Sequence, residues 1–183
     1  QRQLAAGRRL ALSINLSGQS INEDAFLDFL VEQVAPLGQA SRLLCFEITE
    51  TAVVSNLDRA LRLIEVLRDQ GCRFALDDFG TGVSTFSYLK NLPVDYVKID
   101  GAFICNILDS RVDQAMVRAI VDVAGVIGMQ TIAEFVEGEA VHRRLAELGV
   151  DYGQGYWYGR PEPTATVFEA QPPASGVQLG HGG

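Results

Sequence analysis

Short apolar runs alternate with longer stretches of helical spacing along most of the chain. Six of the runs are rich in Ile, Val, Leu and Phe, and they cover 10–17, 43–50, 73–80, 95–101, 130–137 and 151–158. Nearly continuous apolar runs of this length are typical of parallel strands that are covered on both faces. The pattern therefore predicts six strands of a parallel sheet.

The segments between these runs predict amphipathic helices, because their apolar residues recur at spacings of three and four. Polar residues suited to helix starts precede or open the four long segments: Asn22, Asn56, Asp109 and Glu139. Glycines suited to helix ends follow the same segments: Gly38, Gly71, Gly128 and Gly149. A shorter helix is predicted over 85–91.

Regular alternation of strand and helix indicates an α/β fold. Two architectures fit this alternation, an open doubly wound sheet and a TIM-like (β/α)8 barrel. A barrel needs eight strands and about 250 residues, whereas this chain has 183 residues and six recognisable βα units. We therefore expect a barrel that lacks its first part. Proline and late glycines predict a disordered C-terminal tail over 169–183.

Charge and composition exclude several classes of function. The chain has 23 acidic and 15 basic residues, a formal net charge of −8, so it has no general attraction for the DNA backbone. No apolar stretch reaches the roughly 18 residues of a membrane helix, and the chain does not open like a signal peptide. Three scattered cysteines fit reduced thiols. We expect no DNA partner, no membrane segment in this chain and a cytoplasmic location, with a parent protein that can be membrane-anchored.

Histidine chemistry is nearly excluded as well. The chain has two histidines, too few for a histidine metal site or a Ser/His/Asp triad. His142 stands beside two arginines in a helical pattern, and we expect it on a solvated helix face.

Polar residues gather where the predicted strands end: Asn15, Glu47, Glu50, Asp77, Asp78, Lys98, Glu134 and Gln154. The carboxyl ends of parallel strands converge on one face, where α/β proteins carry their active sites. One carboxylate at a strand end is usually a helix cap, but six consecutive strands with polar ends are hard to explain by capping alone. Carboxylates and carboxamides without His or Cys suit Mg²⁺, Mn²⁺ or Ca²⁺.

Strand periodicity separates Asp77 from Asp78, since neighbours on a regular strand point to opposite faces. Asp78 reaches the same centre as Asp77 only if the chain turns at the strand end, and the glycines of 79–82 suit such a turn. Lys98 leaves two interpretations open. It is either a structural ion-pair partner of the acids, or a group that orients a nucleophilic water or offsets the charge of a phosphate.

Five ordered motifs resemble those of the EAL-domain family, bacterial phosphodiesterases that hydrolyse cyclic di-GMP to linear pGpG. They are FEITET at 46–51, DDFGTG at 77–82, PVDYVKID at 93–100, AEFVE at 133–137 and GQGY at 153–156. The resemblance predicts an EAL domain over 1–168 with the fold of an incomplete barrel. The Glu-Ala-Leu motif that names the family is absent, so we expect an N-terminally truncated domain.

The resemblance implies a metal site that binds Mg²⁺ or Mn²⁺, with two ions. Asn15, Glu47 and Asp77 resemble ligands of one ion. Asp77 would bridge to a second ion, which Asp78 helps to hold. Phosphodiester hydrolysis would then proceed by in-line attack of a metal-activated water.

The resemblance also implies roles around that water. Lys98 resembles a lysine that contacts it, Glu134 an acid that helps to bind and activate it, and Gln154 a residue near it. Glu50 resembles the glutamate that holds the loop after Asp78, and in this family that loop also helps to form a homodimer. Upstream sensor or GGDEF-type domains are the expected fusion partners in the parent protein.

Two other functions stay open at this stage. Degenerate relatives bind cyclic di-GMP or a protein partner without cleaving the nucleotide, so an inactive receptor or interaction module is the main alternative. Considered without the resemblance, the strand ends also fit an enolase-like barrel, in which acids hold Mg²⁺ and Lys98 acts as a base. The presence of all the site residues together favours the phosphodiesterase.

Overall fold

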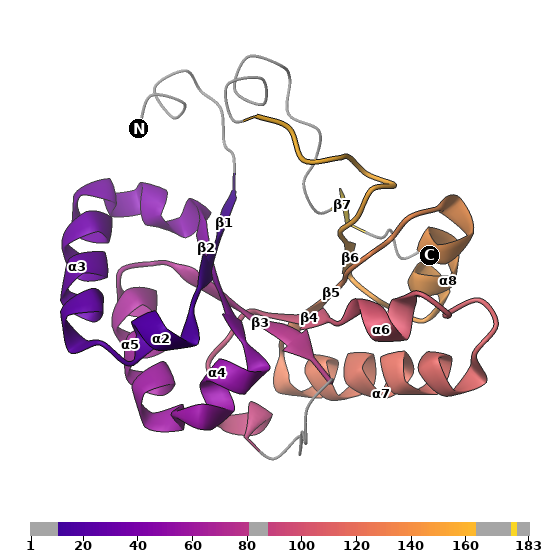
Figure 1. The fold of residues 1–183 in the computed structure, drawn as a ribbon, viewed down its shortest axis with the longest axis horizontal. Helices are drawn as coiled ribbons and strands as arrows, with labels where there is room; N and C mark the ends of the chain where they lie inside the picture. The colour runs from indigo at the N-terminus through magenta and orange to yellow at the C-terminus, as the bar shows by residue number, and fades with distance from the viewer. Residues whose placement is uncertain (1–10, 81–87, 164–176, 179–183) are drawn as a thin grey trace. The chain divides into compact units, whose positions relative to one another are not determined.

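The computed structural model describes residues 11–80, 88–163 and 177–178 (Figure 1). The chain divides into two compact units. The first comprises Gln1–Asp77 and Gly82–Asp95, and the second comprises Asp78–Thr81 and Tyr96–Gly183. Each unit is built of parallel strands with helices between them, as the alternating pattern predicts. No helix of the described residues combines the length and the apolar character needed to cross a membrane.

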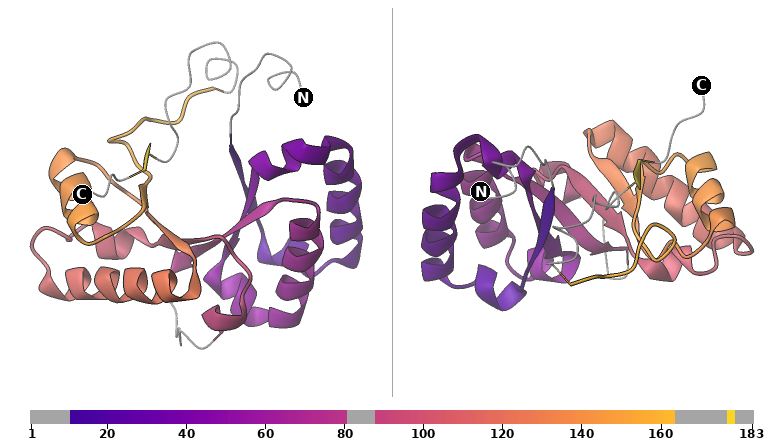
Figure 2. Two further views of the ribbon diagram at one scale, coloured as in Figure 1. Left: turned by 180° about the vertical axis from the view of Figure 1, so that it is seen from behind. Right: turned by 90° about the horizontal axis from the view of Figure 1, so that it is seen from above.

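The first unit contains three parallel strands, β1 (Leu12–Leu16), β2 (Leu44–Thr49) and β3 (Arg73–Phe79), in which the last two residues of β3 belong to the second unit. Its helical segments are α2 (Gly18–Ile21), α3 (Asp24–Val34), the 3₁₀ segment η1 (Ala35–Leu43), α4 (Glu50–Ser55), α5 (Leu57–Asp69) and the 3₁₀ turn η2 (Leu89–Asn91). Buried aromatic rings of neighbouring strands, Phe46 and Phe74, pack with their centroids 5.6 Å apart. Helix α5 has a buried face formed by Ala60, Leu63, Ile64 and Leu67. The helices of this unit lie beside its strands (Figure 2).

The second unit contains β4 (Tyr96–Ile99), β5 (Gln130–Ala133) and β6 (Tyr152–Gly153), which are parallel. A short β7 (Val177–Gln178) pairs antiparallel with β6. The helices are α6 (Gly101–Ile104), α7 (Arg111–Ile127) and α8 (Glu139–Glu147). Apolar residues from strands and helices form its core, including Val97, Ile99, Val117, Ile120, Ala133 and Leu145.

Helix ends agree with the sequence at some positions and differ at others. Asn56 caps α5 by accepting from the backbone N–H of Arg59 at 3.4 Å, and Gly128 ends α7 in the left-handed conformation at φ 88°. The prediction that Asn22 starts a helix was wrong, because Asn22 ends α2 and its amide donates to the Gly18 carbonyl. At α7 the cap is Ser110 rather than the preceding aspartate, since the Ser110 hydroxyl reaches the third N–H of the helix.

All six predicted strands are present, and all are shorter than their apolar runs, β5 and β6 by the most. β5 ends at Ala133 because the backbone takes a left-handed turn at Phe135, at φ 52°. β6 is limited to Tyr152–Gly153, because the following residues form turns. The predicted helix over 85–91 lies partly outside the described residues, and its last three residues form η2. The predicted disordered tail lies outside them too, apart from β7.

Candidate functional site

Three predicted metal ligands share one face of the first unit's strands. Asn15 is the direct register partner of Glu47, and Glu47 is the partner of Ala75 on β3. Side chains of register partners stand on the same face, and Asp77 returns to that face two residues after Ala75. Glu47 and Asp77 are buried, whereas Asn15 is exposed. Regular strand geometry alone therefore places these three side chains on one face of the strands.

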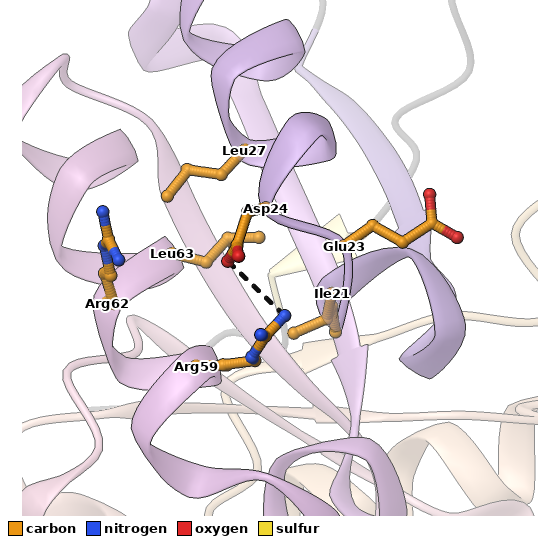
Figure 3. Close-up of a pocket in the computed structure, with 7 residues that line it drawn as sticks. All are labelled: Ile21, Glu23, Asp24, Leu27, Arg59, Arg62 and Leu63. Carbon is orange, nitrogen blue, oxygen red and sulfur yellow. Dashed lines mark ion pairs between the residues drawn. The ribbon is translucent and has the colours of Figure 1, made fainter.

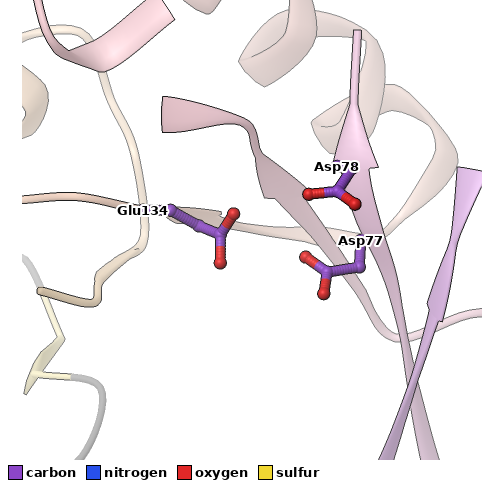
Figure 4. A group of neighbouring side chains, drawn as sticks. All are labelled: Asp77, Asp78 and Glu134. Atoms are coloured by element: carbon purple, nitrogen blue, oxygen red, sulfur yellow. The ribbon is translucent and has the colours of Figure 1, made fainter. Parts of the chain in front are cut away.

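A group of three carboxylates forms at the ends of β3 and β5 (Figure 4). One oxygen from each of Asp77, Asp78 and Glu134 lies within 4.8 Å of the others. Asp77 is joined to Asp78 by a peptide bond, and Asp78 and Glu134 belong to the second unit. Carboxylate oxygens this close repel one another unless a cation offsets their charge. Oxygen-only donors fit a hard divalent cation such as Mg²⁺, Mn²⁺ or Ca²⁺.

Left-handed backbone explains how Asp78 reaches its neighbour. Asp78 has φ 55° and Phe135 has φ 52°, and they are the non-glycine residues of the described chain with positive φ. A left-handed residue costs about 1–2 kcal/mol, so such residues tend to persist where function requires them. The left-handed backbone therefore begins at Asp78 itself, and Gly80, within the segment 79–82 whose glycines suit a turn, is left-handed as well at φ 102°.

Lys98 and Glu134 form an ion pair within the second unit, with 2.8 Å between Nζ and Oε1. The Lys98 side chain is 3 % exposed and that of Glu134 is 14 % exposed, so solvent screens this pair little. The Glu134 backbone N–H donates to the Ile99 carbonyl at 3.2 Å, which continues the pairing of β4 with β5. The structure thus shows Lys98 as an ion-pair partner of an acid, which is the first of the two interpretations. This ion pair is compatible with a role of Lys98 toward a phosphate.

Phe135 follows Glu134 directly and fixes the chain there. Its ring lies against Gly101, where an added Cβ would collide with the ring. Gly101 is buried at the start of α6, only three residues after Lys98. The ring therefore links the segment after Glu134 to the segment after Lys98. Sequence analysis missed Phe135, although an aromatic residue directly after a predicted catalytic acid was a usable signal.

Gln154 lies beside the Glu134 segment through its backbone. Its N–H donates to the Ala133 carbonyl at 2.8 Å, and its carbonyl accepts from the Val136 N–H at 3.0 Å. The Gln154 side chain is exposed. The structure thus places Gln154 directly after β6, hydrogen-bonded through its backbone to the residues on either side of the Glu134–Phe135 pair.

Glu50 is buried at the start of α4 and accepts a hydrogen bond of 2.5 Å from the Tyr88 hydroxyl. Burial, followed by this hydrogen bond and the charge of Glu50, raises the pKa of Tyr88 above its usual value. Tyr88 is the first described residue after the loop that Glu50 is predicted to hold. That loop, and with it the predicted dimer contact, lies at 81–87, outside the described residues.

His142 differs from its predicted place on a solvated face. It is half-buried, and its Nδ1 lies 2.8 Å from the Tyr158 hydroxyl. Burial raises the pKa of Tyr158, whose ring also rests against Gly153. The helical pattern around His142 gave no sign of this contact, because its partner lies 16 residues further along the chain.

A separate surface pocket of about 230 Å³ lies in the first unit (Figure 3). Asp24 and Arg59 pair across it at 3.5 Å, and Ile21, Leu27 and Leu63 contribute its apolar surface. The pocket contains no predicted site residue. The candidate site is therefore the set of polar residues at the strand ends.

Comparison with known proteins shows which family the chain resembles. A family model described as EAL domain matches residues 1–161. The cyclic di-GMP phosphodiesterase PdeB of Shewanella oneidensis is 44 % identical over 158 residues, which are 86 % of this chain and 18 % of PdeB. This chain therefore spans about a fifth of that relative's length.

Solved structures agree with this comparison. The PaMucR phosphodiesterase in complex with c-di-GMP matches this chain with a TM-score of 0.84 at 32 % sequence identity. The match covers 91 % of this chain and 68 % of the PaMucR chain. Klebsiella pneumoniae BlrP1, in a complex with manganese and cyclic di-GMP, matches with a TM-score of 0.77 at 30 % sequence identity. This match covers 87 % of this chain and 41 % of the BlrP1 chain. The predicted fold class, an incomplete barrel of EAL type, is confirmed. The chain belongs to the EAL-domain family.

Proposed function

We propose that this chain carries the hydrolytic site of a cyclic di-GMP phosphodiesterase and that the complete domain converts cyclic di-GMP to linear pGpG. The observation that carries the proposal is the group formed by Asp77, Asp78 and Glu134, with Lys98 paired to Glu134. The names of the relatives support the same activity. An enolase-like reaction has no such support.

The oxygen donors at the strand ends supply the ligands for the proposed metal ions. Asn15, Glu47 and Asp77 share a face and would hold one Mg²⁺ or Mn²⁺ ion, and Asp77 and Asp78 would hold a second. Bound divalent cations lower the pKa of water and stabilise negative charge on a phosphate. An acidic chain of net charge −8 needs such cations to bind a nucleotide with two phosphates.

The ion pair of Lys98 with Glu134 supplies the groups for proton transfer and for stabilising negative charge in the proposed reaction. A Glu134 oxygen would accept the proton of the attacking water as its oxygen bonds to phosphorus. The bond from phosphorus to the departing ribose oxygen breaks, and that oxygen takes up a proton to complete the linear product. Lys98 would hold Glu134 in place in the free protein and would face the developing negative charge when substrate is bound. Gln154 would lie beside this water.

The remaining proposals concern the parent protein. Because the chain is 18 % of PdeB in length, upstream sensor or GGDEF-type domains are proposed rather than observed. A cytoplasmic location and a homodimer through the loop after Asp78, held by Glu50, are proposals of the same kind.

The test is hydrolysis of cyclic di-GMP with Mg²⁺ or Mn²⁺, followed by chromatography of the products. It compares this chain with a version extended at its N-terminus to restore the Glu-Ala-Leu strands. We expect linear product from the extended form. The matched pair of variants is Glu134→Gln and the exposed Glu137→Gln, of which only the first should lose activity.

Nucleotide binding without product in both forms would contradict this proposal and would identify a receptor instead. Full activity of Glu134→Gln would contradict the role given to Glu134.

A further inference from the structure

The chain forms a bulge directly after β5. The N–H of Gln154 donates to the Ala133 carbonyl at 2.8 Å, and its carbonyl accepts from the Val136 N–H at 3.0 Å. In a regular parallel ladder these two bonds reach residues two apart on the neighbouring strand, whereas Ala133 and Val136 are three apart. One extra residue is therefore inserted at Glu134–Phe135, which makes this segment a β-bulge. Bulges beside active sites re-aim a side chain, and here that side chain is Glu134.

Phe135 gives the bulge its left-handed backbone, at φ 52°. Glycine reaches this conformation without steric cost, whereas a phenylalanine stays there only where the surrounding structure holds it. The Phe135 ring packs on Gly101, which has no side chain to collide with it. Gly101 is itself fixed, because Asp100 caps α6 by accepting from the Ala102 N–H at 2.7 Å. The ring therefore ties the bulge to the segment that follows β4.

The other side of the bulge is fixed at Val136. This residue is completely buried, and its carbonyl accepts from the Trp157 N–H at 3.0 Å. The backbone of Val136 also lies so close to Gly155 that a side chain at Gly155 would collide with it. The backbone is thus held on both sides of Phe135, and the Glu134 side chain leaves it to meet Lys98 at 2.8 Å.

Exposure separates Phe135 from an ordinary core residue. Its side chain is 59 % exposed, so it buries little apolar surface and contributes little to the core. Core packing therefore does not explain a large aromatic residue at a position that suits glycine. The contact that distinguishes Phe135 is the one with Gly101, and its effect falls on the backbone of Glu134.

We propose that Phe135 is a positioning residue for Glu134. Its ring, seated on Gly101, holds the bulge in one conformation and so keeps the Glu134 carboxylate against Lys98. A glycine at position 135 would reach the same φ but also many others, so the carboxylate would sample more directions. The catalytic consequence rests on the proposed function, whereas the hold on the ion pair does not depend on it.

The first test is kinetic and uses the domain extended to restore the Glu-Ala-Leu strands. Phe135→Gly should lower kcat for cyclic di-GMP about tenfold and leave KM within about twofold, because a misdirected Glu134 accepts the proton less often while substrate binding is unchanged. Phe135→Tyr keeps the ring and should retain kcat within about twofold. Phe29→Ala, which removes a ring that is 52 % exposed on α3, is the matched control and should leave kcat unchanged.

The second test needs no activity. Lys90 and Lys98 are the two lysines of this chain, and Lys90 is exposed, so Lys90→Arg assigns their ammonium signals in nitrogen-15 NMR spectra. A buried, ion-paired ammonium group exchanges its protons slowly with water, which keeps its signal sharp. The Lys98 signal should be sharp in the native chain and in Phe135→Tyr, and broadened in Phe135→Gly. Circular dichroism checks that each variant is folded.

Unchanged kcat in Phe135→Gly, or a Lys98 signal as sharp as in the native chain, would overturn the proposal. A raised KM with unchanged kcat would also overturn it and would show that the ring contacts substrate instead. If the extended native domain does not hydrolyse cyclic di-GMP, the proposed function fails. The Lys98 signal then decides by itself whether Phe135 holds the ion pair.

Discussion

The two units place their site residues by different physical means. In the first unit, Asn15, Glu47 and Asp77 share a face because three regular strands lie in register. In the second unit, Asp78 stands at a left-handed residue, and Glu134 is held by a buried ion pair and by the ring that follows it. Regular geometry follows from residue spacing, whereas the second arrangement depends on contacts between residues far apart in sequence. The difference predicts that substitutions in the second unit affect stability and activity together.

The largest expected effect is on catalysis. In the extended domain, Glu134→Gln should lower kcat by about 10²–10⁴-fold, because the amide cannot accept the proton of the attacking water. Asp77→Asn should likewise abolish turnover, since it weakens the donor set. Steady-state hydrolysis of cyclic di-GMP measures both, with Glu137→Gln as the control. Near-normal kcat in either variant would remove the roles assigned to these residues.

The next effect is on stability. Lys98→Ala leaves the largely buried Glu134 carboxylate without its observed ion-pair partner, so we expect a loss of about 3–5 kcal/mol in the free energy of unfolding. Urea denaturation measures this loss. The exposed pair of Arg143 with Glu139 is the control, and Arg143→Ala should cost less than about 1 kcal/mol. Equal losses in the two variants would show that burial does not strengthen the first pair.

A smaller effect tests the ring that follows Glu134. Gly101→Ala introduces a Cβ that meets the Phe135 ring, and we expect it to destabilise the chain by about 1–3 kcal/mol. Phe135→Ala removes the atoms in conflict, so the double variant should recover part of this loss. A double-mutant cycle measures the coupling. Additive effects would mean that the ring and Gly101 do not constrain one another.

The helix caps provide the smallest effect and compare the two units directly. Asn56→Ala removes the cap of α5 and Ser110→Ala removes the cap of α7, and each should cost about 1 kcal/mol. Thermal unfolding of the two variants measures the losses. Similar values would show that local capping acts alike in both units, and that their difference lies in the site residues.

The fold class and the location of the polar residues could be predicted from the sequence, because both depend on local spacing. The strands, the α/β class and the shared edge of the polar residues follow from periodicity, which acts locally. Asp78 was correctly expected to need a turn, and Gly80 is left-handed as the turn chemistry suggests. Asp78 is left-handed as well, and sequence patterns rarely place a non-glycine residue in that conformation. The contacts of Phe135 with Gly101 and of His142 with Tyr158 join distant segments, which no periodicity reports.

Strand β1 has a consequence for the order in which the site assembles. Among the described residues it is one of the two edge strands of the sheet, and its side chains from Leu12 to Asn15 are exposed. Edge strands open locally at a low free energy, so their amides exchange with solvent deuterium before those of central strands. Asn15, a proposed metal ligand, would thus be recruited last, after Glu47 and Asp77 are in place. A divalent cation should then slow deuterium uptake in β1 more than in β2.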